Sequence, residues 1–211
     1  MSTDTVFGFR QPGRGEGTLI FPLGDGRVRI YFFYRMRNGD RRGLTGERKF
    51  SEFIAACIGA GVPADWIEHA RSAGPLAEFD GADKWIDRPY KHGIALVGDA
   101  ASCNDPTWGN GLSLSLRDVR TFTDRLKETD DWHAAGQQYA TQHEEYYRNI
   151  KRITGWLADL HYEIGPEADR RREKAYDLLR EDKSRSPDFI ALGPDAPHNE
   201  TARRRLFGED I

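Results

Sequence analysis

The chain has 211 residues, of which 38% are hydrophobic and 31% are charged. This length supports one large domain, or one and a half small ones, with an apolar core. The 31 Lys and Arg side chains nearly balance the 34 Asp and Glu side chains, and the formal charge of −3 creates no strong field for nucleic acid or anionic lipid. We therefore expect no nucleic-acid partner and no membrane partner.

Three features indicate a cytoplasmic protein. Cys57 and Cys103 are too few for a disulfide framework. Residues 1–11 lack the basic and then apolar order of a signal peptide, and no apolar run approaches the roughly 18 residues needed to span a bilayer.

The first half of the chain predicts a small sheet with short helices. Residues 18–35 contain two strand-like runs joined by Gly24, Asp25 and Gly26, which suit a tight hairpin turn. Apolar residues at helical spacing predict a helix that ends at Gly59, and a second helical segment follows at residues 64–70. Residues 76–88 suit one or two strands. Residues 94–97 form a short apolar run that we expect to be a buried strand.

The second half predicts helices. A period of 3.6 residues begins after Gly111, and a longer helix is expected at residues 132–162, followed by another at residues 166–181. The apolar residues of the first helix are Leu112, Leu116, Val119, Phe122 and Leu126. The stripe of the second consists of Tyr139, His143, Tyr146, Ile150, Ile153 and Leu157. The tail is rich in Pro, Gly and charge, so residues 183–211 are expected to form an extended arm.

Gly98 and Asp99 stand directly after the short strand. Ligand groups in α/β folds often lie where a buried strand ends, and a carboxylate there can accept hydrogen bonds from sugar-type hydroxyls. Gly98 has no Cβ, so a backbone or a ligand can approach it closely. Asp99 is therefore a candidate for holding a hydroxyl group.

A constrained loop leads from this strand to the helix. It reads Pro106, Thr107, Trp108, Gly109, Asn110 and Gly111. The loop brings free backbone N–H groups to a helix N-terminus, where they stabilise negative charge on a bound group. However, a strand, a turn and a helix with an Asp cap are also common without any ligand, and these features alone leave both interpretations open at about even odds.

Other candidate sites are weaker. His143 has Tyr147, not a second His, four residues later, so a packed helical His is favoured over a metal ligand. Cys103 and His92 lack a third catalytic group, and a small buried Cys is the favoured interpretation. The arginine runs at residues 170–172 and 203–205 are bordered by acids, which favours solvated helix faces.

The residues after the short strand carry a family resemblance. They are Gly98, Asp99, Ala100, Ala101, Pro106, Gly109, Gly111 and Asp118. Their spacing resembles the flavin-binding signature of class A flavoprotein monooxygenases, the para-hydroxybenzoate-hydroxylase-like family. Residues 21–34 resemble the substrate-domain sheet of that family, and residues 156–172 and 191–210 resemble its C-terminal helices and arm.

The resemblance implies an α+β fold, derived from an α/β plan. It implies an antiparallel substrate-domain sheet with short helices in residues 1–93. Residues 94–182 would carry the flavin-binding motif and the C-terminal helices of an FAD-binding domain, followed by the arm at residues 183–211.

The resemblance also implies site residues and cofactors. Asp99 would hold a ribityl hydroxyl of FAD, residues 109–112 would place amides beside the N1 and O2 edge of the flavin, and Pro106 would lie near its reactive face. The implied cofactor-binding set is Gly98, Asp99, Pro106, Gly109, Asn110, Gly111 and Leu112. The implied substrate contacts are Phe21, Tyr31 and Phe33, which without the family would simply be core residues. NAD(P)H would be the reductant, and neither a catalytic side chain nor a metal ligand is assigned.

The sequence departs from the family pattern in three places. Ser102 stands where His is frequent, and Leu112 followed by Ser113 replaces Met or Leu followed by Asn. The glycines at positions 13, 15 and 17 follow no recognisable apolar strand and open no helix, so the N-terminal Rossmann motif Gly-x-Gly-x-x-Gly is expected to be absent.

The resulting expectation is an FAD-dependent monooxygenase of a small, aromatic substrate, present as an incomplete chain. Two alternatives are a non-catalytic or partner-dependent FAD-binding fragment and a flavin-dependent halogenase or reductase relative, although the sequence has no Trp-x-Trp-x-Ile-Pro signature. A companion chain, or self-association through an uncovered apolar face, is expected as a protein partner.

Overall fold

The computed structural model describes residues 4–36 and 41–210. The chain divides into two compact units. Unit 1 comprises residues 1–80 and 158–172, and unit 2 comprises residues 81–157 and 173–211.

Unit 1 contains an antiparallel sheet with the strand order β1 (Phe7–Gln11), β2 (Glu16–Gly24) and β3 (Arg27–Tyr34). Asp25 and the two glycines that flank it have positive φ between β2 and β3, as a tight turn requires. The predicted hairpin is therefore confirmed. Strand β1 was not predicted. It contains Phe7 and Phe9 and precedes the glycines at 13, 15 and 17, so the expectation that these glycines follow no apolar strand is wrong. They nevertheless lead into β2, and a dinucleotide motif would lead into a helix instead.

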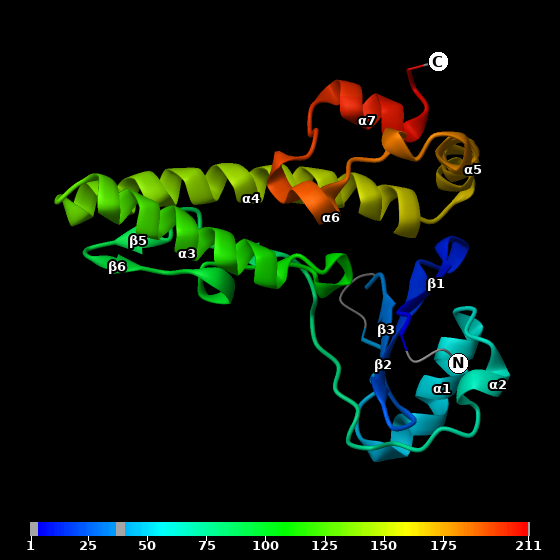
Figure 1. Ribbon diagram of the computed structural model, residues 1–211. Coiled ribbons are helices and arrows are strands. Elements are labelled where there is room, and N and C mark those ends of the chain that lie inside the picture. Colours follow the sequence, from blue (N-terminus) through cyan, green and yellow to red (C-terminus); the bar gives the residue numbers. More distant parts are fainter. Residues whose placement is uncertain (1–3, 37–40, 211) are drawn as a thin grey trace. The chain divides into compact units, whose positions relative to one another are not determined.

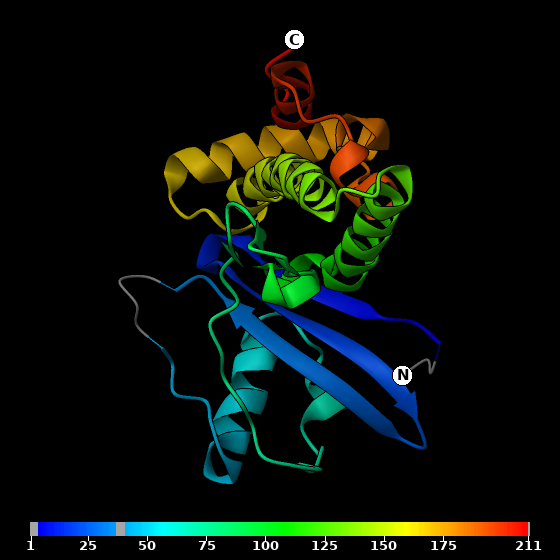
Figure 2. The ribbon, with the colours of Figure 1, turned by 90° about the vertical axis from the view of Figure 1, so that its left-hand side faces the viewer.

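Two helices cover one face of this sheet (Figures 1 and 2). Helix α1 (Phe50–Gly59) and the short helix α2 (Ala64–Ile67) agree with the predicted helices. The core between helices and sheet consists of Ile20, Phe53, Ile54, Cys57, Val62 and Ile67. Burial raises the pKa of the Cys57 thiol to about 12, so this cysteine is an inert core residue.

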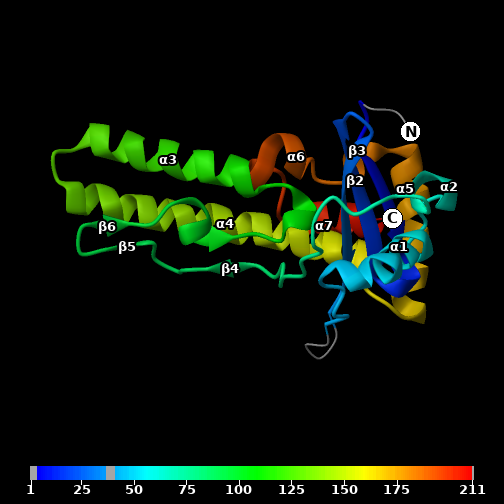
Figure 3. The ribbon, with the colours of Figure 1, turned by 90° about the horizontal axis from the view of Figure 1, so that it is seen from below.

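Unit 2 is built on two long helices, α3 (Gly111–Glu128) and α4 (Trp132–Tyr162), which lie side by side (Figures 1 and 3). Residues 132–157 of α4 belong to this unit, and its last turn belongs to unit 1. Helix α5 (Pro166–Glu181) follows. All three helices were predicted, and the whole predicted stripe of α4 is buried.

The described strands of unit 2 form two-stranded ribbons. Strand β4 (Lys84–Trp85) pairs with β7 (Ser102–Cys103), and β5 (Tyr90–Lys91) pairs with β6 (Ile94–Ala95). The expectation of a buried strand at residues 94–97 is wrong, because β6 pairs only with β5 among the described residues and the Ile94 side chain remains exposed.

The C-terminal segment differs from the expected extended arm. It contains the short helix α6 (Phe189–Leu192) and helix α7 (Glu200–Phe207). Asp188 caps α6 and Asn199 caps α7, each by accepting a hydrogen bond from the backbone N–H of the residue three positions further on. These caps, together with the burial of Leu206 and Phe207, explain why helical turns replace an extended conformation here.

The fold class is the predicted one, a mixed α+β chain with antiparallel sheets. Within the described ranges, no helix is both long and apolar enough to cross a bilayer.

Candidate functional site

The turn that carries Asp99 is fixed at Gly98. Residues Gly98–Ala100 form a 3-10 turn, and Gly98 has φ of 60°. A Cβ at this position would lie 2.8 Å from Oγ of Ser115 in α3. The Gly98 N–H donates to Oδ2 of Asp118 at 2.7 Å, which ties the turn to α3. Only glycine satisfies both the backbone angle and the close approach.

Asp99 lies in the middle of this turn and is exposed to solvent. Among the residues that the structure describes, it makes no hydrogen bond and no ion pair. A carboxylate in this position is available to accept a hydrogen bond from a ligand hydroxyl.

The loop before α3 is also well anchored. Oδ1 of Asp105 accepts from the Thr107 N–H at 2.9 Å and so caps the 3-10 turn Pro106–Trp108. Burial raises the pKa of the Asp105 carboxyl, and the nearby Asp83 carboxylate adds to this effect. The Trp108 ring is buried edge-to-face against Phe189, with ring centroids 6.0 Å apart. The Asp105 cap and the buried Trp108 ring therefore fix the conformation of the exposed part of the loop.

The N-terminus of α3 is open to a ligand. No side chain caps this end in the described part of the chain, and its first turn contains no acidic residue. Gly109 has φ of 70°, and neither at Gly109 nor at Gly111 would a Cβ meet any atom within 4 Å. Asn110 is buried, and its Nδ2 has no hydrogen-bond partner among the described residues. Backbone donors, a buried amide donor and free space thus occur together, and these residues fit the polar edge of a flavin ring.

The cofactor-binding residues implied by the sequence therefore lie in one segment of unit 2. Pro106 and Leu112 are exposed at the two ends of the loop. The substrate contacts implied by the resemblance lie in unit 1.

The three proposed substrate residues share one face of the unit 1 sheet. Phe21, Tyr31 and Phe33 alternate with the core residues of β2 and β3, so they lie opposite the face that α1 and α2 cover. The Phe21 and Tyr31 rings meet edge-to-face at 5.7 Å, and the Phe33 ring crosses Gly17, where a Cβ would clash with it. None of the three belongs to the buried core cluster of unit 1, so they are not the simple core residues that their composition suggests.

The other candidates do not form catalytic sites. Cys103 is exposed in β7, so the expectation of a buried Cys103 is wrong. No described contact joins Cys103 to His92, and the described residues contain no cluster of three potential metal ligands. His143 is buried and packed in α4, as expected.

In the arginine run at residues 170–172, Arg170 is exposed as expected, but Arg172 differs from its expected solvated state. Arg172 is buried, and its guanidinium donates to the backbone oxygens of Leu160 and Glu163 and to Asp169. It therefore connects the last turn of α4 to α5 within unit 1.

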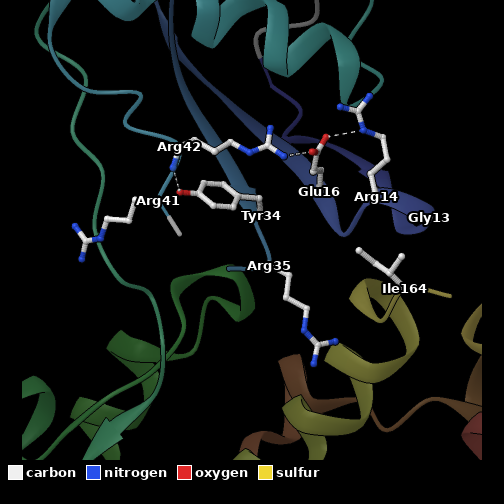
Figure 4. A pocket seen from close by; sticks show the side chains of 8 residues that line it. All are labelled: Gly13, Arg14, Glu16, Tyr34, Arg35, Arg41, Arg42 and Ile164. Atoms are coloured by element: carbon white, nitrogen blue, oxygen red, sulfur yellow. Dashed lines mark hydrogen bonds and ion pairs between the residues drawn. The ribbon is translucent and has the colours of Figure 1, made fainter. Parts of the chain in front are cut away.

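Unit 1 also has an open cavity of about 480 Å³ that the sequence did not indicate (Figure 4). Its lining consists of Gly13, Arg14, Glu16, Tyr34, Arg35, Arg41, Arg42 and Ile164. Buried Glu16 pairs with Arg14 at 3.1 Å and with Arg42, whose guanidinium also lies 4.9 Å from the Tyr34 ring centre. These two arginines compensate the charge of Glu16, although its buried Oε2 makes no hydrogen bond among the described residues, and we assign no chemistry to this pocket.

The sequence did not reveal the buried polar groups beneath the Gly98 turn. Asp118, His143 and Ser102 form one hydrogen-bonded set between α3, α4 and β7. The available signal was the spacing of Tyr139, His143 and Tyr147, which places three side chains with polar tips on the otherwise apolar face of α4.

The fold and the loop together define a class of site: a 3-10 turn with an exposed carboxylate, followed by an uncapped helix N-terminus that suits a polar ring edge. No family model matches the chain. The chain is 28% identical over 154 residues to a rifampicin monooxygenase from Streptomyces venezuelae, and the match covers 71% of this chain and 31% of that protein. It thus spans about a third of the length of this curated relative. The distant similarity supports a relationship to monooxygenases.

Proposed function

We propose that this chain is part of an FAD-dependent monooxygenase and holds the ribityl and isoalloxazine part of the cofactor. One observation carries this proposal: the exposed Asp99 and the uncapped N-terminus of α3 lie in one segment, beside the unpartnered Nδ2 of Asn110. The similarity to a rifampicin monooxygenase supports the class.

Each residue has a defined role in this proposal. Asp99 accepts a hydrogen bond from a ribityl hydroxyl. Of the amides of residues 109–112, that of Gly109 already donates to the Pro106 carbonyl at 3.1 Å, so the amides of residues 110–112 donate to the polar edge of the ring. Gly98 and Gly109 permit the backbone angles that present these groups. Bound FAD would supply the redox and oxygen chemistry, with NAD(P)H as its reductant. The protein binds, orients and stabilises negative charge at the ring edge.

We assign a small, aromatic substrate to the sheet face of Phe21, Tyr31 and Phe33. Aromatic rings favour edge-to-face contacts with a further ring, and this face already contains one such pair. In the complete enzyme that this proposal implies, replacing Tyr31, the most exposed of the three, with Ala should raise KM more than it lowers kcat.

A ligand series tests the proposed cofactor site. If the chain holds the ribityl and ring parts, riboflavin and FAD should bind with Kd values within about threefold of each other, a difference of less than 1 kcal/mol. ADP, which lacks the ring, should not displace riboflavin in a flavin-fluorescence titration. Displacement by ADP, or binding of FAD without binding of riboflavin, would contradict this assignment.

A second candidate function is a partner-dependent flavin-binding module. Leu112, Leu116 and Val119 lie along one face of α3, and their side chains are 76%, 63% and 51% exposed. Exposed apolar groups at this spacing suit a protein contact. We propose that a segment or companion chain with a dinucleotide-binding motif covers this face, because the relative is about three times as long as the matched region.

Analytical ultracentrifugation distinguishes the possible occupants of this face. A companion chain is supported if this chain sediments as a monomer and its flavin affinity rises when a protein with the dinucleotide-binding motif is added. A stable homodimer that Leu116→Gln dissociates would show self-association instead and would contradict it.

A further inference from the structure

A continuous set of buried hydrogen bonds lies beneath the Gly98 turn. Asp118 Oδ2 accepts from the Gly98 N–H at 2.7 Å, and Asp118 Oδ1 lies 3.1 Å from Nδ1 of His143. Nε2 of His143 lies 2.9 Å from Oγ of Ser102. Asp118 and His143 are fully buried, and Ser102 is 2% exposed. The His143 imidazole therefore links the two ends of the segment 98–102, which contains Asp99. It contacts Ser102 directly and Gly98 through Asp118.

The order carboxylate, imidazole and hydroxyl is the order found in nucleophilic hydrolases. Here, however, Oγ of Ser102 is enclosed, which leaves no space for a substrate carbonyl beside it. The hydrogen-bonded set of Asp118, His143 and Ser102 therefore positions the backbone around it and does not attack a substrate.

The chemistry of the partners fixes the tautomer of His143. A carboxylate oxygen only accepts, so the contact with Asp118 requires a proton on Nδ1 of His143, which donates to it. In this Nδ1–H tautomer, Nε2 accepts from the Ser102 hydroxyl. The Tyr146 hydroxyl donates to the same Asp118 oxygen. With Oδ1 engaged twice, Oδ2 is turned toward the Gly98 N–H.

Helix α4 holds the same backbone at two further points. The Tyr139 hydroxyl donates to the Leu96 carbonyl at 2.6 Å, and the Tyr147 hydroxyl donates to the Ser102 carbonyl at 3.4 Å. Tyr139, His143 and Tyr147 are four residues apart, so they lie along one face of α4. His143 is the member of this row that reaches both Ser102 and Asp118.

We propose that His143 is a positioning residue that sets the Gly98 turn, and through it the direction of the Asp99 carboxylate. The inference rests on the proposed flavin site for its functional consequence, but the effect on the turn can be measured without flavin.

Two substitutions separate the two hydrogen bonds of the imidazole. In His143→Asn the side-chain amide nitrogen takes the position of Nδ1, so the donor to Asp118 is kept and the contact with Ser102 is lost. In His143→Gln the amide nitrogen takes the position of Nε2, so the donor to Asp118 is lost. His69→Gln, at an exposed position in unit 1, is the control.

We expect amide exchange at Gly98, measured by NMR, to quicken about tenfold in His143→Gln and to change less than threefold in His143→Asn, because only the former removes a charge-assisted hydrogen bond. FAD affinity should follow the same order. Equal effects of both variants, or wild-type exchange at Gly98 in His143→Gln, would overturn the proposal.

A measurement on the unmodified protein covers the case in which a variant does not fold. The ring ¹⁵N shifts of His143 should show the Nδ1–H tautomer near neutral pH, and an Nε2–H tautomer would overturn the proposal. If the wild-type chain binds no flavin, the proposed function fails, while the exchange and tautomer results still decide whether His143 sets the turn.

Discussion

Gly98 is subject to two separate constraints, a positive φ and a close approach to Ser115, whereas Gly109 has only a positive φ. Substitution of Gly98 should therefore cost more stability. Gly98→Ala combines a positive φ with a Cβ placed 2.8 Å from Ser115 Oγ, so we expect unfolding free energy to fall by about 2–4 kcal/mol. Gly109→Ala has a similar φ but open space, so it should cost only about 1–2 kcal/mol. Urea unfolding of the two variants checks this difference.

Ser115 provides the control for the steric part. Adding Ser115→Ala to Gly98→Ala removes the hydroxyl nearest the new methyl group, so stability should recover in part. Equal destabilisation by Gly98→Ala and Gly109→Ala would contradict the close approach of the turn to α3.

His161 predicts a loss of stability in mild acid. Burial lowers its pKa from 6.5 to about 4, and the positive charges of Arg10 and Arg172 add to the effect. Below pH 6.5 the unfolded chain binds the proton first, so this contribution is complete above pH 6.5 and is lost as the pH falls toward 4. The loss is at most about 3 kcal/mol.

Chemical unfolding near pH 7 and near pH 5 measures this effect. His161→Gln should reduce the difference in stability between the two conditions, whereas His69→Gln, at an exposed site, should leave it unchanged. A pH dependence that persists in full in His161→Gln would show that other groups cause it.

Single residues of the site differed in how far the sequence could predict them. Gly98, Asp99 and Gly109 could be found because a short apolar run followed by turn glycines leaves a local pattern, although Asp99 lies in a 3-10 turn and not at the end of a buried strand. Pairing of His143 with Asp118 and Ser102 could not, because it depends on how α3, α4 and β7 pack, and these partners are 25 and 41 residues apart from His143 along the chain.

At the scale of elements, α3 and α4 carry apolar stripes of similar spacing but different burial. The stripe of α4 is buried, whereas Leu112, Leu116 and Val119 of α3 are exposed and Leu114 and Asp118 face inward. We therefore expect Leu116→Gln to change stability by no more than about 0.5 kcal/mol, and Leu114→Ala to cost about 2–5 kcal/mol.

Far-UV circular dichroism during urea unfolding compares these two variants. A large loss in Leu116→Gln with a small loss in Leu114→Ala would mean that the inward face of α3 is assigned incorrectly.

The elements themselves show which signals a sequence carries. Helices α1, α4 and α5 were predicted closely because their periodic patterns are long or are ended by Gly or Pro. Strand β1 has only five residues with a Gly among them, and β5 and β7 have two residues each, so their patterns are too short to recognise. Strands β4 and β6 lie inside the predicted strand segments at residues 76–88 and 94–97, but each has only two residues. Periodicity also identified α3 as a helix but did not show which of its faces is covered.

At the scale of the whole molecule, the chain consists of two units with separate sets of candidate residues. Unit 2 contains the proposed cofactor segment, and unit 1 contains the aromatic face proposed for the substrate. The chain spans about a third of its monooxygenase relative, so the complete reaction is a proposal that involves more than these residues. The central claim concerns unit 2 alone: Asp99 and the N-terminus of α3 hold a flavin.

The most direct test of this claim is an equilibrium titration of the purified chain with FAD, followed by the visible absorbance of the flavin. We predict saturable binding that weakens about tenfold or more in Asp99→Ala, as expected for the loss of a hydrogen bond to a charged group, and that is unchanged in the exposed control Asp87→Ala. No spectral change with the wild-type chain, or equal affinities for wild type and Asp99→Ala, would contradict the claim.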